Sequence, residues 1–523
     1  MNQTIGILKN GNSHFPYWGG KIDKIRGLDP LGQQNASERI YAHLLPGITN
    51  LTNRIRYYGF YCWLLSEYDS KREKEYNEKD QRRFIRRAEL TIALVMINHN
   101  PKESQIPGSN KARELLGNLG DSSTISVSRY TDEAKSSDSY WKYSTGAFGQ
   151  YYAASMNQMG LIRAMVEDGQ SVYMASDNGE SLTGQQLAEI FDLNLDREAK
   201  KHFHEVIENG LLPVKYIPII YESFNISMIP QNTGEWNGFH ELLTGPDIPN
   251  KPEETKTHRS NTIDYVLQEP SELTAESFLD NFFEWGLQNQ HEEFTTGFGW
   301  YQYRLNEFWQ FSCGTLFWSI MEYLHWHKSG IYSKEDLVKE FIYEICKEAS
   351  LDGNKPVSSA IRVLELGVVQ DDLSDIHQSI SSRDVMKTGS KAIEILFMLF
   401  SLSEDRIRHY AEIIHKNRIG QSGSFLFNML SLMDGKQFEE SVASFMRNFL
   451  TERILNRHRI VAINKLGTGS RSTIKFEEEG GYLLFDSNFA PSFTNPRIET
   501  LFRILADLGK LRTVDDGYLV ASA

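Results

Sequence analysis

The stretch from His43 to Leu65 repeats apolar and aromatic positions with the period of an α-helix. Positions four and three residues apart form one apolar face, made of Leu51, Ile55, Tyr58, Cys62 and Leu65. A neighbouring face at the same period is made of Arg54, Tyr57, Tyr61 and Leu64. Because a helix that is apolar or aromatic on nearly every side is a buried one, we expect a central core helix here. Candidate N-cap residues for this helix are Thr49, Asn50 and Thr52.

Two arginines, Arg54 and Arg56, lie inside this predicted core helix. A buried guanidinium without a partner is very costly, so each side chain requires an anion beside it. That anion is either a carboxylate of the same chain or a phosphate of a bound molecule. Arg54 and Arg56 are therefore predicted to be structural or anion-binding residues, and a structural ion pair is the more common arrangement.

Helical patterns rich in aromatic residues fill residues 271–350, and further amphipathic helices follow as far as residue 450. Aromatic side chains at helical spacing usually form a core, and base stacking is the alternative use of such a cluster. The changes in pattern divide the chain into four predicted segments: an N-terminal helical domain at 1–195, a mixed connecting region at 196–270, an aromatic-rich helical domain at 271–450 and a C-terminal region at 451–523.

The pattern changes from helical to strand-like in two further places. A helix that stops at Gly160 precedes short strand-like pieces and a new helix start at Thr183, and a helix that stops at Leu508-Gly509 precedes a terminal Asp-Gly hairpin. Both orders resemble the end of a winged-helix domain. Residues 460–485, with turns at Gly467 and Gly480, predict a small β meander. The predicted fold class is mainly α (α+β): multi-helical, with small winged-helix-like β hairpins and a C-terminal β meander.

Composition narrows the functional classes. The 523 residues are 40% hydrophobic and carry a net charge of −14, so the surface as a whole does not attract nucleic acid or anionic membranes. Three widely spaced cysteines suggest neither a disulfide framework nor a zinc site, which fits a reducing cytoplasm. We expect no signal peptide and no membrane span, because the sequence lacks the apolar runs that both require.

Two local basic clusters stand out against this acidic background. The first is Arg82, Arg83, Arg86 and Arg87 in a charged helical run; the second comprises Arg453, Arg457, Arg459 and Lys465. A charge run is usually a solvated helix face, whereas the sharper hypothesis is local contact with nucleic-acid phosphates. We predict these eight residues as the nucleic-acid-binding candidates.

The sequence suggests no catalytic residues, no metal ligands and no cofactor. The phosphate-loop, HExxH and GxSxG motifs do not occur. Carboxylates such as Glu477 to Glu479 and Asp486 lack the lysine partner expected of a metal-dependent nuclease. A non-enzymatic role is therefore the leading expectation, although a nuclease site that forms only in the fold or in a complex stays open.

One resemblance adds a context. The residues Leu44 to Thr49, followed by Thr52, Arg54, Arg56-Tyr57 and Trp63, resemble a motif of uncharacterised bacterial proteins from anti-phage defence islands. Similar tails in such chains match Arg457-His458, Lys465-Leu466, Phe476-Glu477 and Leu508-Gly509. The resemblance implies a component of a multi-gene bacterial defence system that works beside an ATPase or nuclease. Our leading hypothesis is a sensor, adaptor or scaffold in such a complex, with local binding of nucleic acid or of a partner protein. The alternatives are a metal-dependent nuclease effector and a winged-helix transcriptional regulator.

Overall fold

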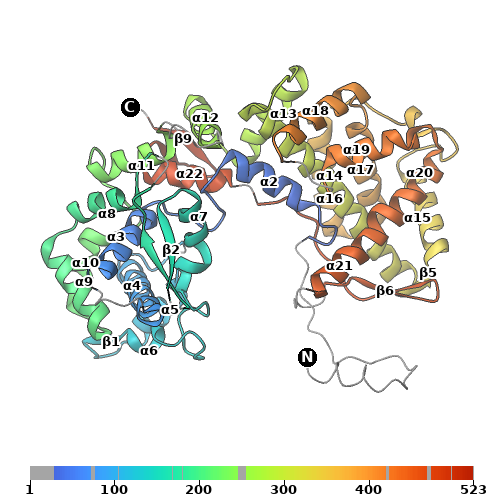
Figure 1. Cartoon of the computed structure of the whole chain (residues 1–523). Coiled ribbons are helices and arrows are strands. Elements are labelled where there is room, and N and C mark those ends of the chain that lie inside the picture. Colours follow the sequence, from blue (N-terminus) through green and yellow to red (C-terminus); the bar gives the residue numbers. More distant parts are fainter. Residues whose placement is uncertain are drawn as a thin grey trace. The chain divides into compact units, whose positions relative to one another are not determined.

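The computed structural model describes residues 29–523 except for 72–76, 104, 168, 179–180, 246–254, 420–422, 468–472, 496 and 522–523. The fold is mainly helical, with a few small antiparallel sheets (Figure 1). The predicted fold class is thereby confirmed. None of the described helices combines the length and the apolar character that crossing a membrane requires.

The chain forms two compact units, each built from segments that are distant in sequence. The larger unit comprises Ala36–Asn306, Glu412–Gly420 and Thr494–Ala523, and the smaller unit comprises Met1–Asn35, Glu307–Ala411 and Gln421–Phe493. Each unit draws on more than one of the four segments predicted from the sequence, and the boundaries of those segments stay a prediction.

The larger unit contains α3 (Arg56–Lys71), in which every residue from Arg56 to Leu65 is buried. The prediction of a core helix is thus confirmed, but the helix begins at Arg56. Leu51 lies before it and is exposed, and the Thr52 hydroxyl donates to the Thr49 carbonyl (3.1 Å) within a turn. The expected N-cap residues therefore close a turn ahead of α3.

Further helices and strands surround α3 in the larger unit. The helices are α4 (Glu78–His99), α5 (Ser109–Gly117), α6 (Ser128–Thr131), η1 (Phe148–Tyr152), α7 (Ala153–Gln158), α8 (Gly184–Leu193), α9 (Arg197–Asn209), η2 (Val214–Tyr216), α10 (Ile217–Phe224), α11 (Gly234–Thr244), α12 (Thr255–Gln268), α13 (Ala275–Gln288) and α22 (Ile498–Asp507). Strands β1 (Thr124–Ser126) and β4 (Leu211–Pro213) pair antiparallel. The aromatic core beside α3 includes Phe60 and Trp63, which pack against Phe191, Phe203 and Phe224.

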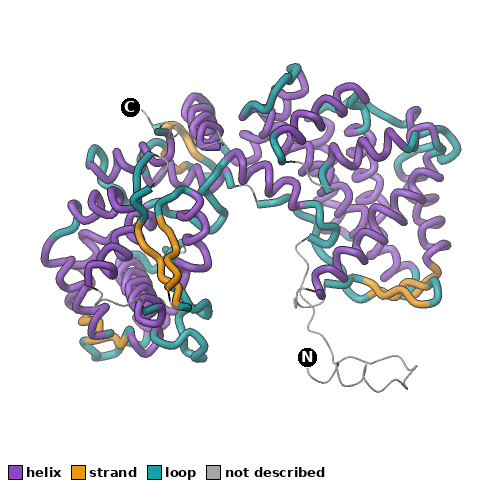
Figure 2. The backbone as a smooth tube through the Cα atoms, viewed as in Figure 1, coloured by secondary structure: helices purple, strands orange, loops and turns teal. Residues whose placement is uncertain are grey.

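Two hairpins in the larger unit follow the helix–glycine–hairpin order predicted from the sequence (Figure 2). Helix α7 precedes Gly160, whose φ of +75° suits glycine, and then the antiparallel pair β2 (Ile162–Glu167) and β3 (Gln170–Ala175). Thr183 caps α8 in a capping box, as its sequence position suggested. Helix α22 precedes Gly509 and the pair β8 (Leu511–Thr513) and β9 (Tyr518–Val520).

The smaller unit is a helical assembly around an aromatic core. Its elements are η3 (Tyr323–His327), β5 (Ile331–Ser333), α15 (Lys334–Glu348), η4 (Val357–Ser359), α16 (Leu366–Ser382), α17 (Val385–Leu399), α19 (Phe425–Asp434), η5 (Gln437–Glu439), α20 (Val442–Asn448), η6 (Phe449–Asn456), α21 (Arg457–Gly467), β6 (Phe476–Glu479) and β7 (Tyr482–Phe485). Helices α2 (Gln34–Leu44), α14 (Thr296–Glu322) and α18 (Glu404–Lys416) contain the points in the sequence where one unit gives way to the other. In the part of α14 that belongs to the smaller unit, the buried side chains include Trp309, Phe311 and Phe317, which supports the core interpretation of the aromatic cluster.

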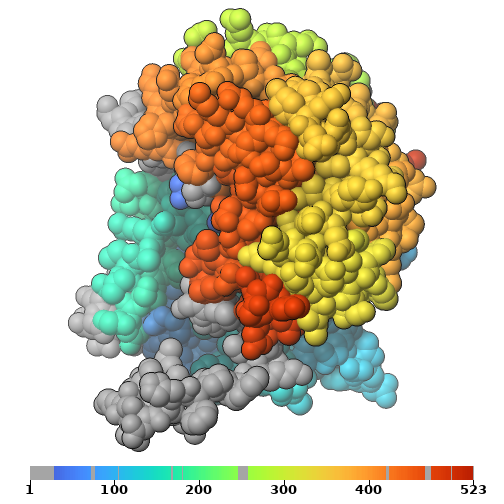
Figure 3. All heavy atoms as spheres, turned by 90° about the vertical axis from the view of Figure 1, so that its right-hand side faces the viewer, coloured from blue at the N-terminus to red at the C-terminus, as the bar shows by residue number. Residues whose placement is uncertain are grey.

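The predicted β meander is only half correct. Strands β6 and β7 form a hairpin around Gly480-Gly481, but residues 460–466 belong to helix α21. The third strand of this sheet is β5, whose Ile331 lies opposite Leu484. In Figure 3 the red-orange residues of this hairpin accordingly lie beside the yellow residues of β5 and α15. The apolar, β-branched run of Ile460-Val461 favoured a strand, and tertiary contacts of α21 with residues 29–32 outweigh that preference.

Candidate functional site: a polar pocket beside Arg54 and Asp507

The two predicted arginines occupy different local positions. Arg56 is the first residue of α3, and Arg54 lies in the irregular segment just before it. The Arg56 side chain donates from Nε to Glu235 Oε1 (2.7 Å) and from Nη2 to Glu235 Oε2 (3.0 Å), and it also bonds the Asn225 carbonyl. The Arg56 and Glu235 side chains are 4% and 0% exposed. This is a closed, bidentate, buried ion pair.

Arg54 forms an ion pair of a different kind. Its Nη1 contacts Asp507 Oδ1, and its Nη2 lies 3.4 Å from both oxygens of Glu103. The Asp507 side chain is 4% exposed, although the charged group of Arg54 reaches a pocket. Both arginines thus take carboxylates of the same chain as partners, which is the structural alternative of the two that the sequence left open.

The Arg54–Asp507 pair is incompletely satisfied. Within the part of the chain that the structure describes, Arg54 Nε and Asp507 Oδ2 are both buried and have no hydrogen-bond partner. Buried polar atoms in proteins nearly always have a partner, so an unpaired donor and an unpaired acceptor in one ion pair require an explanation. A ligand that supplies both complementary groups is one such explanation.

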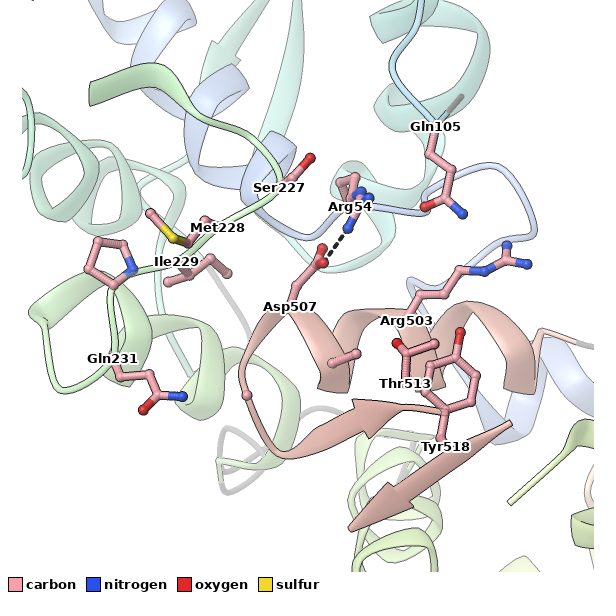
Figure 4. A pocket seen from close by; sticks show the side chains of 13 residues that line it. Arg54, Gln105, Ser227, Met228, Ile229, Gln231, Arg503, Asp507, Thr513 and Tyr518 are labelled. Atoms are coloured by element: carbon pink, nitrogen blue, oxygen red, sulfur yellow. Dashed lines mark hydrogen bonds and ion pairs between the residues drawn. The ribbon is translucent and has the colours of Figure 1, made fainter. Parts of the chain in front are cut away.

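A cavity of about 650 Å³ lies beside this pair. Its lining is mixed in character and includes Arg54, Gln105, Ser227, Met228, Gln231, Arg503, Asp507, Thr513 and Tyr518. Figure 4 shows Asp507 at the centre, with Met228, Ile229 and Gln231 on one side and Gln105, Arg503 and Tyr518 on the other. The volume lies within the range of pockets that bind small organic ligands.

The sequence places Asp507 at an unfavourable position for a helical acid. It is the last residue of α22, where the partial negative charge of the helix dipole disfavours a carboxylate. Gly509, with a φ of +67°, then turns the chain toward β8, and Trp236 Nε1 donates to the Leu508 carbonyl (2.8 Å). These interactions hold the end of α22 against the helical body of the larger unit.

Burial raises the pKa of Asp507 to about 7; Arg54 opposes this shift and the negative charge of Glu103 adds to it. Burial lowers the pKa of Arg54, but Asp507 and Glu103 outweigh that effect and leave it raised overall. Arg54 therefore stays charged, while Asp507 can gain or lose a proton near neutral pH.

The four arginines of α4 are used differently from one another. Arg86 is 1% exposed and donates to the Tyr143 and Trp141 carbonyls and to the Ser139 hydroxyl. Arg87 forms a bidentate pair with Asp132 and donates to two backbone carbonyls of α9. Arg82 and Arg83 are more exposed and pair with Glu78 and Asp80 of their own helix. Of the four arginines, Arg82 and Arg83 are the ones that present an accessible charge.

The C-terminal basic cluster mostly holds the chain together. Arg457 donates to the carbonyls of Leu31 (2.5 Å) and Gly32 (3.0 Å), and Lys465 donates to the Asp29 carbonyl (2.6 Å). Arg453 donates to side chains of α19. Arg459 is 46% exposed and pairs with Glu478 (2.7 Å). Nucleic-acid contact stays a prediction, and the exposed candidates for it are Arg82, Arg83 and Arg459.

Sequence reasoning identified Arg54 but missed Asp507, Glu103 and Arg503. The signal that could have identified Asp507 is the acid at the C-terminal end of a strongly amphipathic helix. Across the described residues, no group of three or more His, Cys, Asp or Glu side chains is arranged to hold a metal ion.

Comparison of the sequence with protein-family models gave no match, and neither did comparison with curated proteins or with solved structures. The candidate site therefore rests on its own geometry.

Proposed function

We propose that this chain is a ligand-sensing, non-enzymatic component of a bacterial anti-phage defence complex that works in the cytoplasm beside an ATPase or nuclease partner. The proposal is supported by residues of both quoted motifs that line the same pocket. Arg54, from the N-terminal motif, and Gly509, from the C-terminal tail, both line the pocket although they lie far apart in sequence. Two parts of the resemblance thus converge on one cavity.

The position of the pocket suits a sensor. Asp507 belongs to α22, whose hairpin β8–β9 completes the C-terminal winged-helix-like module, and Arg54 and Glu103 belong to the N-terminal helical part. A ligand between these segments contacts both of them. It shifts the equilibrium between two arrangements of the module to the extent that it binds one arrangement more tightly.

The test is protection of a phage-susceptible bacterial host that expresses the chain together with the genes adjoining its own. Plaque numbers should fall with the wild-type chain and return to the empty-vector level with Arg54→Gln. The matched control is Arg129→Gln, which removes an exposed guanidinium of the same unit away from the pocket. Protection that is absent with the wild-type chain would refute the defence role.

The same cells distinguish the main alternative. Affinity purification of the tagged chain should recover a protein product of the adjoining genes. Plasmid cleavage by the chain alone with Mg²⁺ or Mn²⁺, abolished by a chelator, would instead favour the nuclease effector.

A further inference from the structure

The pocket beside Asp507 combines three kinds of group in one cavity. The Asp507 carboxylate and the Arg54 guanidinium provide an acceptor and a donor that the described residues leave unpaired. Met228 and the ring of Tyr518 provide apolar surface on opposite sides of Asp507 (Figure 4). Arg503 provides a second cation, 34% exposed, whose carboxylate partner Glu499 lies 3.6 Å away.

A nucleotide carries the complementary groups. The hydrogen-bonding edge of a base holds an N–H donor next to an acceptor, the face of the base stacks on aromatic and thioether groups, and the phosphate is an anion. Its donor suits the Asp507 carboxylate and its acceptor suits the Arg54 guanidinium, whose unpaired atoms Oδ2 and Nε are buried in residues that line the pocket. Polar side chains such as Ser227 and Thr513 suit the hydroxyl groups of a sugar.

We propose that this pocket binds a nucleoside monophosphate, with the base edge at Asp507 and Arg54 and the phosphate at Arg503. The proposal deepens the ligand-sensing role proposed above and rests on it. The cavity of about 650 Å³ accommodates a molecule of this size, whereas an extended nucleic-acid strand requires a continuous groove.

In this proposal the base and the phosphate contact different residues, so the two contacts can be tested separately. Isothermal titration calorimetry of the full chain would use the 5′-monophosphates of adenosine, guanosine, cytidine and uridine, the matching nucleosides, and ribose 5-phosphate. At least one nucleotide should bind, and ribose 5-phosphate should bind at least about tenfold more weakly, a ratio equal to about 1.4 kcal/mol.

Two variants then assign the contacts. Asp507→Asn should weaken binding of the nucleotide and of its nucleoside alike by about tenfold or more, because it replaces one acceptor oxygen of the carboxylate with an NH2 donor. Arg503→Gln should weaken the nucleotide and leave the nucleoside unchanged. Arg129→Gln, which removes an exposed guanidinium remote from the pocket, should bind like the wild type. Thermal melting of each variant checks that the fold is intact.

The opposite outcomes are equally defined. The absence of binding by all four nucleotides, or binding that both Asp507→Asn and Arg503→Gln leave unchanged, would overturn the nucleotide site. Phage protection that still depends on Arg54 in that case would leave the defence role standing. Nucleotide binding without phage protection would support the nucleotide site and refute the defence role.

Discussion

Arg54 and Arg56 lie two residues apart, and each pairs with a buried carboxylate, but the two sites differ in closure. The Arg56 guanidinium is covered, and the Glu235 carboxylate that it contacts also accepts from the Asn194 amide (3.2 Å). The Arg54 site leaves one buried nitrogen and one buried oxygen unpaired next to a cavity. The first arrangement satisfies its own polar groups, and the second leaves groups that a bound molecule can satisfy.

The carboxylates differ as well as the arginines. Glu235 lies on α11 with hydrogen-bond donors at both oxygens, whereas Asp507 lies at the end of α22 and has a donor at one oxygen. A complete set of partners favours a structural role, because further contacts have no free group to use. A buried titratable group that lacks some of its hydrogen-bond partners is the pattern found at many functional sites.

The largest expected effect is at the closed pair. Arg56→Gln leaves Glu235 buried without its cation, so the free energy of unfolding should fall by about 3–5 kcal/mol. Arg54→Gln should cost less, about 1–3 kcal/mol, because Asp507 can take up a proton. Urea unfolding of the full chain measures both, with Arg83→Gln as the control. Equal losses at the two arginines would contradict the distinction between them.

An effect of up to similar size is expected in the pH dependence of stability. An aspartate has an ordinary pKa of about 3.9 in the unfolded chain, and burial raises that of Asp507 to about 7. The folded state therefore binds the proton more tightly, so the contribution of Asp507 to stability is full below about pH 4 and declines as the pH rises to about 7. The decline is up to about 4 kcal/mol, since one pKa unit equals about 1.4 kcal/mol.

The measurement for this pH effect is the difference in unfolding free energy between the wild type and Asp507→Asn at several pH values. Other carboxyls titrate in both proteins and cancel in the difference. The wild type should lose stability relative to the variant between about pH 4 and pH 7 and run parallel to it above pH 7. A difference that is independent of pH would show that Asp507 has no raised pKa.

Local signals in the sequence were sufficient for most of the fold. The period of apolar positions identified α3 as a core helix, and the glycine stops at Gly160 and Gly509 located both hairpins. The exception was the run 460–466, which is helical because of contacts that its local sequence does not contain. Arg457 and Lys465 project from α21 to the backbone of residues 29–32, more than 400 positions away.

The candidate site followed the same rule. The need of Arg54 for an anion could be inferred from its apolar surroundings in the sequence, and the structure confirms a partner within the chain. The identity of that partner could not be inferred, because Asp507 is 453 positions away. The cavity was equally hidden, since it depends on how the 227–231 segment packs against α22 and β8. The requirement of a buried charge for a partner can be inferred from the local sequence, whereas the identity of that partner depends on the tertiary fold.

The smallest expected effects concern two arginines of the smaller unit, one held by backbone carbonyls and one exposed. Arg457→Gln removes the donor of the Leu31 and Gly32 carbonyls and should lower the unfolding free energy by about 1–3 kcal/mol. Arg459→Gln breaks an exposed pair with Glu478 and should lower the unfolding free energy by at most about 1 kcal/mol.

If the predicted nucleic-acid contact exists, Arg459→Gln should also reduce the slope of log affinity against log salt by about one, because one phosphate contact is lost. A salt titration with a DNA duplex measures that slope. An unchanged slope would remove Arg459 from the candidates, whatever its effect on stability, since an arginine that contacts no phosphate releases no counterion when it is replaced.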